Sequence, residues 1–481
     1  MASTTTSTES KPSSNSHPHY KPLLWLVAMG FFMQALDSTI VNTALPAMAH
    51  SLGESPLRMQ SVVIAYMLTM AIIIPASGWL ADRVGTRKIF FAAIVFFTLG
   101  SILCASSPSL NILVISRIVQ GIGGAMLLPV GRLTILRALP RSLFLPAMSF
   151  ITVPGLVGPL IGPTLGGWLV EAASWHWIFL INVPIGILGA IATLRFMPDL
   201  RSPEKISFDT TGYLLLTSSM VGLSIGLDGL SEMGLPHAVI MVLLVFAFAS
   251  LSAYWLHAVR RGDHALFSLK LFSVPSYRIG VLGNLFARIG SGSMPFLLPL
   301  LLQISLGHTP AQAGMMMIPV ALSAMLSKQF TTPLVRHFGY RKVLVVNTIL
   351  VGLSIASFAL MTANEPTVVR IVQMCLFGFF NSMQFTCMNT LSLKDLDDKL
   401  ASSGNSLLSM VMMLSMSLGV ASAAAILAGF SEFIGSTTHA LQAFHSTFIC
   451  VGIMTSAAAW IFWQLPHDEP VQEKRDVGLV E

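Results

Sequence analysis

Three charged side chains stand inside long apolar runs of the sequence, at Asp37, Arg117 and Arg288. A charge inside a membrane-length apolar run is costly, and such residues usually face a cavity or a partner. Burial favours the neutral form of a carboxylate and a nearby cation favours the charged form, so Asp37 can switch its protonation state. We therefore interpret Asp37 as a candidate residue for proton coupling.

Arg117 is the candidate partner of Asp37. At a rise of 1.5 Å per residue, Asp37 would lie roughly 12 Å and Arg117 roughly 10 Å below the outer surface, so the two match in depth. A cation beside Asp37 would make proton release depend on whether the pair is intact. The alternative is a permanent buried salt bridge, or a contact that only packs helices together.

Arg288 has no acidic residue near its depth in the predicted spans of the C-terminal half. An unpaired arginine at this depth suggests contact with an anionic or chelating group of a substrate. The alternatives are a pair with Asp37 or bonds to backbone carbonyls. Uncharged polar residues of the spans are further candidates for the substrate cavity, although each could instead bond between helices. They are Gln34, Asn42, Asn284, Gln303 and Asn381.

The composition indicates the surroundings of these residues. Of 481 residues, 54% are hydrophobic and only 10% are charged, whereas a soluble domain carries about 25% charged residues. The recurring apolar runs predict an all-α polytopic protein in the lipid bilayer. The net charge of +6 is spread over short loops, so no nucleic acid is expected as a partner. The four cysteines lie in apolar runs without CxxC spacing, so no disulfide and no metal site is implied.

Fourteen apolar segments are each long enough to cross about 30 Å of hydrocarbon. Lysine and arginine cluster in alternate loops, and the intervening loops carry almost none. By the positive-inside rule, both termini are predicted to be cytoplasmic, which requires an even number of spans.

The chain contains an internal repeat. Gly339-Tyr340-Arg341-Lys342 matches Gly85-Thr86-Arg87-Lys88, and Arg370-Ile371-Val372-Gln373 matches Arg117-Ile118-Val119-Gln120 at nearly the same offset. Parallel six-span repeats build transporters with a substrate site between the halves. The predicted organisation is a disordered cytoplasmic tail (1–22), an N-terminal six-helix bundle (23–197), two inserted spans with linkers (198–276), a C-terminal six-helix bundle (277–464) and a second cytoplasmic tail (465–481).

A polar turn between the second and third predicted spans is rich in charge. Its acid, Asp82, stands beside basic side chains, and such a group can form a charge network in one state and release it in another. The downstream copy of the turn has Arg336 at the equivalent position, so only one half carries the acid. The alternative is a purely topological role. The predicted conformational gate consists of Gly78, Asp82, Arg83, Gly85, Arg87 and Lys88.

Several stretches resemble motifs of the major facilitator superfamily. The loop at 78–88 resembles its signature between the second and third helices, and Arg117-x-x-Gln120-Gly121-x-Gly123-Gly124-Ala125 resembles its fourth-helix motif. Residues 36–46 and 175–186 resemble motifs of its fourteen-span drug:H⁺ antiporter branch, with His176 where arginine is common. Within that branch, the chain is most similar to the MdtD-type transporters of bacteria.

A glycine-rich stretch resembles the fifth-helix motif associated with antiporters. It contains Gly158, Gly162, Pro163, Gly166 and Gly167, and Ser149 stands where the longer form of the motif has a further glycine. Glycine lets a neighbouring helix approach closely, and proline bends a helix, so this segment could act as a rocking hinge. The alternative is packing with no effect on the direction of transport.

The resemblance implies a proton-coupled antiporter of the bacterial inner membrane, active as a monomer, that exports drugs or other small toxic compounds by alternating access. Two alternatives keep the fold: an exporter of an organic anion or metal chelate, which Arg288 favours, and a proton-coupled nutrient importer. A third is a membrane sensor or enzyme. No HExxH or GxxxxGK[ST] motif is present, so we expect neither catalysis nor ATP hydrolysis, and no cofactor besides the proton gradient.

Overall fold

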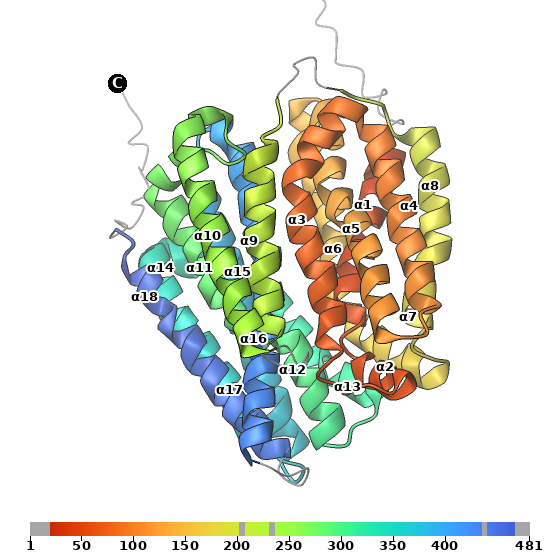
Figure 1. Ribbon diagram of the computed structural model, residues 1–481, viewed down its shortest axis with the longest axis vertical. Helices are drawn as coiled ribbons and strands as arrows, with labels where there is room; N and C mark the ends of the chain where they lie inside the picture. Colours follow the sequence, from red (N-terminus) through yellow and green to blue (C-terminus); the bar gives the residue numbers. More distant parts are fainter. Residues whose placement is uncertain (1–19, 202–206, 230–235, 435–439, 467–481) are drawn as a thin grey trace, which may run out of the picture.

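The computed structural model describes residues 20–201, 207–229, 236–434 and 440–466 (Figure 1). The predicted tails lie almost entirely outside these ranges. Each regular element in the described ranges is a helix. The helices of the N-terminal half are α1 (Tyr20–Ile40), α2 (Leu45–Leu52), α3 (Gln60–Val84), α4 (Thr86–Ala105), α5 (Leu110–Ala138), α6 (Arg141–Ala172), α7 (Trp177–Leu180) and α8 (Asn182–Phe196).

The remaining helices comprise the inserted pair and the C-terminal half. The two spans that the sequence predicts as inserted, here called the inserted pair, correspond to α9 (Thr210–Asp228) and α10 (His237–Arg261). After the short helices η1 (Gly262–His264) and η2 (Leu269–Ser273), the C-terminal half contains α11 (Pro275–Gly292), α12 (Met294–Leu300), η3 (Leu301–Ser305), α13 (Pro310–Met316), α14 (Ile318–Ser357), η4 (Phe358–Leu360), α15 (Thr367–Leu393), α16 (Asp398–Ile434), α17 (Ala440–Ala457) and α18 (Ala459–Trp463).

Length and hydropathy identify twelve helical segments of the described chain that can cross a membrane. One of them, Pro310–Leu360, contains two helical arms that meet at Gly339, whose φ of 76° is not helical. The 32-residue helix α6 adds a further long helix outside these twelve. The all-α polytopic architecture is therefore confirmed, and the number of fourteen spans stays a prediction.

The same helix pairings occur in both halves. In the N-terminal half α1 packs on α6 and α4 packs on α8, and in the C-terminal half α11 packs on α16 and α14 packs on α17. Both halves therefore place their first helix, α1 or α11, against the helix that follows four spans later. The residues of most interest, Asp37 on α1 and Arg288 on α11, thus occupy related places in the two halves.

The inserted pair lies along the side where the halves meet. Helix α9 packs on α10 and also contacts α3 and α16, which belong to different halves (Figure 1). Gln60 Nε2 of α3 donates to Asp228 Oδ1 of α9 at 2.7 Å, and the hydroxyls of Ser224 and Ser417 are 3.4 Å apart. Helix α9 therefore bridges the halves through polar contacts as well as packing.

Asp209 connects the ends of the inserted pair. Its carboxylate accepts hydrogen bonds from the backbone of Gly212 and Leu266 and lies 2.8 Å from His257 Nε2. Burial raises the pKa of Asp209, but the bonds from His257, Gly212 and Leu266 outweigh it, so the pKa lies below its ordinary value. The resulting stabilisation is present above the unfolded pKa and is lost as the pH falls through the folded pKa.

We expect Asp209→Ala to lower the stability of the purified protein at neutral pH by about 1–3 kcal/mol, because charge-assisted bonds and a helix cap are lost together. Thermal unfolding in detergent measures this change. Asp263→Ala is the matched control, because Asp263 is exposed and pairs with Lys270 at the surface. Equal unfolding curves for the two variants would contradict the role of Asp209.

Two predicted spans are interrupted near the end of the bundle where α2, α12 and α13 lie (Figure 1). The predicted span from 23 ends as a helix at Ile40 and resumes as α2 at Leu45, and the predicted span at 277–303 breaks at Ser293. Proline is present at the start of each resumed helix, as Pro46 and Pro295, and it has no backbone N–H to continue the preceding helix.

Candidate proton-binding and substrate sites

Asp37 and Arg117 form a salt bridge in the core of the N-terminal half. Arg117 Nη1 lies 2.6 Å from Asp37 Oδ2, and the two side chains are 1% and 0% exposed. They come from α1 and α5, whose sequence positions gave the same depth. The structure therefore brings together the two residues that the sequence singled out for proton coupling.

Two amides complete the surroundings of the carboxylate. Gln120 Nε2 donates to Asp37 Oδ1 at 2.8 Å, and Asn182 Nδ2 donates to the same oxygen at 3.3 Å. Gln120 also donates to Ser101 Oγ and accepts from Arg117 Nη1 at 2.6 Å. Asp37 thus accepts three hydrogen bonds, from side chains on α5 and α8.

The guanidinium of Arg117 is held by apolar and backbone groups as well. Its Cζ lies 4.1 Å from the centre of the Tyr66 ring, and its Nε donates to the carbonyl of Val62 at 3.3 Å. The cation–π contact with Tyr66 and the carbonyl of Val62 hold the arginine in place independently of Asp37. This arrangement can retain the cation while the carboxylate changes its protonation state.

Two polar atoms beside the pair make no hydrogen bond with any described residue. They are the hydroxyl of Tyr66 and the side-chain oxygen of Asn182, and both are buried. A buried polar atom without a bond is unfavourable unless another state or a small polar species satisfies it. The Tyr66 hydroxyl and the Asn182 oxygen therefore leave hydrogen-bonding capacity unused beside the Asp37–Arg117 pair.

Gln120 and Asn182 belong to stretches that resemble family motifs, but the sequence did not predict that either residue contacts Asp37. Gln120 follows Arg117 by three residues on a helix, so both face the same way. That spacing was a usable signal. Asn182 begins α8 after the turn that follows α7, and its approach to Asp37 depends on tertiary packing that has no local signal.

Protonation of Asp37 would disturb this network directly. An ionised carboxylate only accepts hydrogen bonds, whereas a carboxylic acid must donate one. Both oxygens of Asp37 face N–H donors from Arg117, Gln120 and Asn182. A proton on either oxygen would therefore replace an attractive contact with two opposed donors.

The glycines of α6 connect α1 with the other half of the molecule. A Cβ at Gly158 would lie 2.8 Å from the backbone of Leu36, and a Cβ at Gly166 would lie 2.4 Å from the carbonyl of Ile40. Gly162 faces Thr39 in the same way. Three glycines of the predicted antiport motif therefore pack against the helix that carries Asp37, close to Asp37 itself.

Gly167 faces the C-terminal half. A Cβ there would lie 2.1 Å from the carbonyl oxygen of Pro310, and a Cβ at Gly314 would lie 2.3 Å from the carbonyl of Pro163. Helices α6 and α13 thus cross with their backbones in contact. One helix carries both the contact with α1 and the contact with the opposite half.

Hydrogen bonds reinforce the contact between the halves at this end. Thr164 Oγ1 donates to the carbonyl of Gly314 at 3.1 Å, and Gln303 Nε2 donates to the carbonyl of Thr43 at 2.9 Å. The backbone N–H of Ala311 donates to Glu171 at 3.3 Å. We call the contact of α6 with α13, together with these bonds, the outer seal, after the orientation that the basic loops of the sequence predict.

Arg288 lies on α11 with one polar and one aromatic neighbour. Its Nη2 donates to Asn284 Oδ1 at 3.3 Å, and its Cζ lies 4.6 Å from the centre of the Phe385 ring of α15. Its Nε makes no hydrogen bond with the described residues. Asp37 bonds instead to Arg117, so the alternative of an Asp37–Arg288 pair does not occur in this structure.

The other predicted cavity residues divide between two places. Gln303 belongs to the outer seal, and Asn42 lies beside Thr43 with its side chain bonded to the carbonyls of Ser38 and Thr39. Gln34 is half-buried on α1 with a side-chain oxygen that meets no described partner, and Asn381 is half-buried on α15. In the structure Asn284 therefore contacts Arg288, whereas Asn42 and Gln303 lie at the outer seal.

The charged turn between α3 and α4 uses partners that lie outside it. Asp82 pairs with Arg137 at the end of α5 at 2.6 Å. Arg87 donates to the carbonyl of Met197, and Thr86 exchanges hydrogen bonds with the segment after α8. The sequence anticipated a network within the turn, whereas the structure binds the turn to α5 and to residues 197–200. Gly78 has open space around it, Gly85 adopts a φ of 113°, and Arg83 and Lys88 are exposed.

We expect Asp82→Asn to leave the stability of the protein within about 1 kcal/mol of the wild type, because the pair with Arg137 is partly exposed. If the pair forms in one transport state and breaks in another, the same variant will change the rate of transport. The charge-reversed double variant Asp82→Arg/Arg137→Asp should then recover part of that rate. Unchanged transport in Asp82→Asn would leave the turn with a topological role only.

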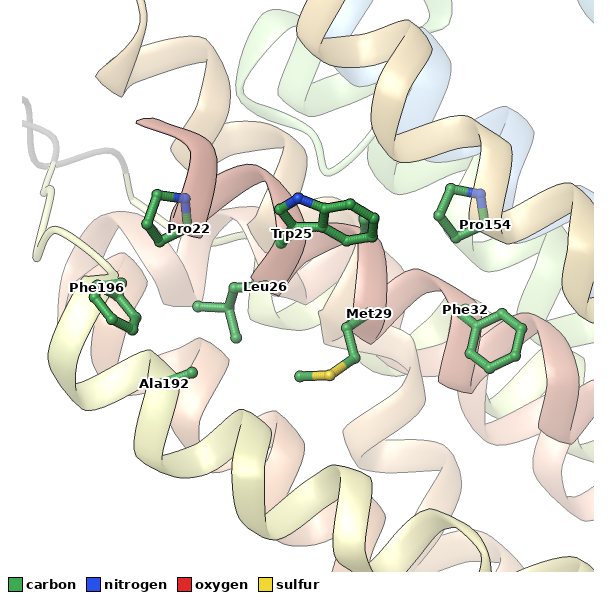
Figure 2. A pocket seen from close by; sticks show the side chains of 9 residues that line it. Pro22, Trp25, Leu26, Met29, Phe32, Pro154, Ala192 and Phe196 are labelled. Atoms are coloured by element: carbon green, nitrogen blue, oxygen red, sulfur yellow. The ribbon is translucent and has the colours of Figure 1, made fainter. Parts of the chain in front are cut away.

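Two cavities stand out in the described chain. One of about 470 Å³ lies between α1, α6 and α8, and the second of about 420 Å³ lies between α3, α5 and α9 (Figure 2 shows the first). Neither is lined by the residues that the sequence assigned to the substrate cavity. Asp37, Arg117 and Arg288 therefore lie apart from both cavities.

Comparison with known proteins identifies relatives along nearly the whole chain. The model of the Major Facilitator Superfamily matches residues 27–420 and 282–480. A "Putative multidrug resistance protein MdtD" of Yersinia enterocolitica is 51% identical over 447 residues, which cover 92% of this chain and 95% of that protein. One of Serratia proteamaculans with the same name is 52% identical over 449 residues, or 92% of this chain and 93% of that protein.

Solved structures share the fold at low sequence identity. A D-xylose–proton symporter matches with a TM-score of 0.65 and 16% identity, over 93% of this chain and 98% of that one. An auto-inhibited peptide transporter of the POT family matches with a TM-score of 0.71 and 14% identity, over 94% and 98% of the two chains.

Proposed function

This chain belongs to the major facilitator superfamily, and we propose that it is a proton-coupled antiporter that exports small molecules of the multidrug type named in its relatives. The single observation that carries the proposal is the position of Asp37. The carboxylate accepts hydrogen bonds from Arg117, Gln120 and Asn182. Asp37 itself lies on α1, which packs against α6, and α6 also forms the outer seal. Proton binding and outer opening can therefore be linked through two neighbouring helices.

The proposed cycle begins with the outer seal closed and the substrate site open to the cytoplasm. A small molecule binds between the halves, where Arg288 with Asn284 and Phe385 can contact it. The halves then rock, the seal between α6 and α13 opens, and the molecule leaves on the outside. This alternating access follows from two related bundles that surround one site.

The proton moves in the opposite direction. After the molecule leaves, a proton from the outer side binds to an oxygen of Asp37, and the donors of Arg117, Gln120 and Asn182 shift away from it. Arg117 stays in place through Tyr66 and Val62. Return to the outward-closed state restores the three hydrogen bonds, so Asp37 releases its proton to the cytoplasmic side. One proton thus enters for each reset of the transporter in this scheme.

The scheme places the protein in the bacterial inner membrane as a monomer with both termini in the cytoplasm. The basic loops of the sequence support this orientation through the positive-inside rule. Reporter fusions at each terminus that are active only in the periplasm test it. Inactive reporters at both ends agree with the scheme, and an active reporter at either end contradicts it.

A second candidate is export of an organic anion or metal chelate, and Arg288 favours it. Its guanidinium is buried, and its Nε forms no bond with a described residue, so it can bind a carboxylate or phosphate. Two fluorescent dyes of opposite charge, ethidium and carboxyfluorescein, separate the candidates. Preferential transport of the anionic dye that is lost in Arg288→Gln would favour the second candidate over the first.

Transport by everted membrane vesicles tests the function itself. When respiration acidifies the vesicle interior, an antiporter accumulates ethidium inside, and an agent that collapses the pH gradient releases it. Dye that instead leaves the vesicles together with protons would indicate a nutrient importer. Vesicles without the protein provide the baseline.

A further inference from the structure

An apolar groove runs along the surface of the N-terminal half between α1, α6 and α8. In Figure 2, Leu26 and Met29 of α1 point toward Ala192 and Phe196 of α8, and Pro154 of α6 stands on the other side of Trp25. The groove has a volume of about 470 Å³ and is lined by apolar side chains. It is separate from the network around Asp37 and from Arg288.

The length of the groove matches one leaflet of a bilayer. Its α1 wall extends from Pro22 to Phe32, and ten residues of helix rise about 15 Å. That length is about half of the 30 Å of hydrocarbon in a typical membrane. Trp25 is 62% and Phe196 49% exposed, so the groove opens toward the surrounding lipid.

Two basic residues are direct sequence neighbours of residues that line one end of the groove. Lys21 precedes Pro22 in the first turn of α1, and Arg195 precedes Phe196 in the last turn of α8. Both are exposed, and neither forms an ion pair with a residue that the structure describes. This end therefore combines positive charge with an apolar slot of one-leaflet length.

We propose that the groove binds one anionic phospholipid of the cytoplasmic leaflet. One acyl chain lies along Leu26, Met29 and Phe32, and the phosphate is held by Lys21 and Arg195. A free phosphate would lack the apolar contacts, and an uncharged lipid would lack the ionic ones. The proposal depends on the cytoplasmic position of the start of α1 and is independent of the transported substrate.

The proposed lipid would lie next to the charged turn between α3 and α4. Arg195 and Phe196 are followed directly by Met197, whose carbonyl accepts a hydrogen bond from Arg87. Leu200 bonds to Thr86 in the same turn. A lipid on the last turn of α8 therefore holds the segment that anchors this turn, so its loss is expected to slow transport without loss of the proton site.

Native mass spectrometry of the purified full-length protein with added phosphatidylglycerol tests the site. Two charges near the surface contribute enough attraction that Lys21→Gln/Arg195→Gln should weaken binding of the tightest lipid about 25-fold. Ala192→Leu, which fills the slot, should weaken it as well. Glycerol phosphate, which has the headgroup without the chains, should not compete.

The matched control is Arg260→Gln/Arg278→Gln, which removes two exposed basic residues away from the groove. Its lipid binding should equal that of the wild type, and size-exclusion profiles show that each variant is folded. An equal loss in this control would reveal diffuse attraction only. Three results would each overturn the proposal: the same loss in the control, undiminished binding in both groove variants, and competition by glycerol phosphate.

Discussion

Replacement of Asp37 by asparagine is expected to reduce transport driven by a pH gradient to the level of vesicles that lack the protein. Asparagine keeps the size of the side chain and, like the protonated acid, offers one acceptor oxygen and one donor group, but it cannot bind and release a proton. Exchange of labelled against unlabelled dye across the membrane needs no net proton movement, so Asp37→Asn should retain it. Parallel measurements of accumulation and exchange in proteoliposomes make this comparison.

Asp228→Asn is the matched control for this prediction. Asp228 is also a buried carboxylate, but it accepts a hydrogen bond from Gln60 of α3, whereas Asp37 pairs with Arg117. Gradient-driven accumulation should survive this change. Accumulation at the wild-type rate in Asp37→Asn would refute the assignment of proton coupling to Asp37.

The buried cation has its own consequence for stability. Removal of one partner from a buried pair leaves an uncompensated charge and costs about 3–5 kcal/mol. Asp37→Ala should therefore unfold at a temperature well below that of the wild type. Asp37→Ala/Arg117→Leu should recover much of the lost stability without regaining proton coupling. This separation of stability from transport distinguishes a proton site from a merely structural salt bridge.

Replacement of Gly167 by alanine is expected to open the outer seal. The added Cβ would lie 2.1 Å from the carbonyl of Pro310, a distance that real Cβ atoms essentially never show, so α6 and α13 must separate. Overpacking of this kind costs about 1–3 kcal/mol, which shifts the balance between closed and open states about 5- to 150-fold. Transport should fall by a comparable factor.

Labelling of a single cysteine measures the seal directly. With the four native cysteines replaced by alanine, Thr43→Cys is buried in the closed state because Thr43 is fully covered and its carbonyl accepts from Gln303. A membrane-impermeant maleimide should label it far faster when Gly167→Ala is present. Gly429→Ala, at a glycine with open space around it, is the control. Equal labelling rates in the Gly167→Ala and Gly429→Ala variants would show that α6 does not form part of the seal.

Much of the fold was accessible from the sequence because hydropathy and membrane thickness leave few choices. The apolar runs, the glycine-rich stretch and the matched depths of Asp37 and Arg117 all reflect one-dimensional patterns. The breaks after Ile40 and at Ser293 were missed because apolar composition continues through them. A hydropathy profile cannot distinguish a continuous helix from two helices joined at a proline.

The parts of the site that depend on tertiary packing were not accessible. Arg137 as the partner of Asp82, and residues 197–200 as the support of the turn at Gly85, come from segments distant in sequence. The bridging position of α9 between α3 and α16 also has no local signal. Asn42 and Gln303 are polar residues of the right type, but the bend after Ile40 and the break at Ser293 place them at the outer seal.

Antiport means that the protein exchanges a proton for an exported molecule. Proton uptake driven by an outward gradient of that molecule tests this exchange most directly. Proteoliposomes of the purified protein are loaded with ethidium and a pH-sensitive dye, then diluted into medium without ethidium and without an imposed pH gradient. Efflux of ethidium should acidify the lumen in the wild type and leave it unchanged in Asp37→Asn. A lumen that stays neutral or becomes alkaline in the wild type would contradict antiport.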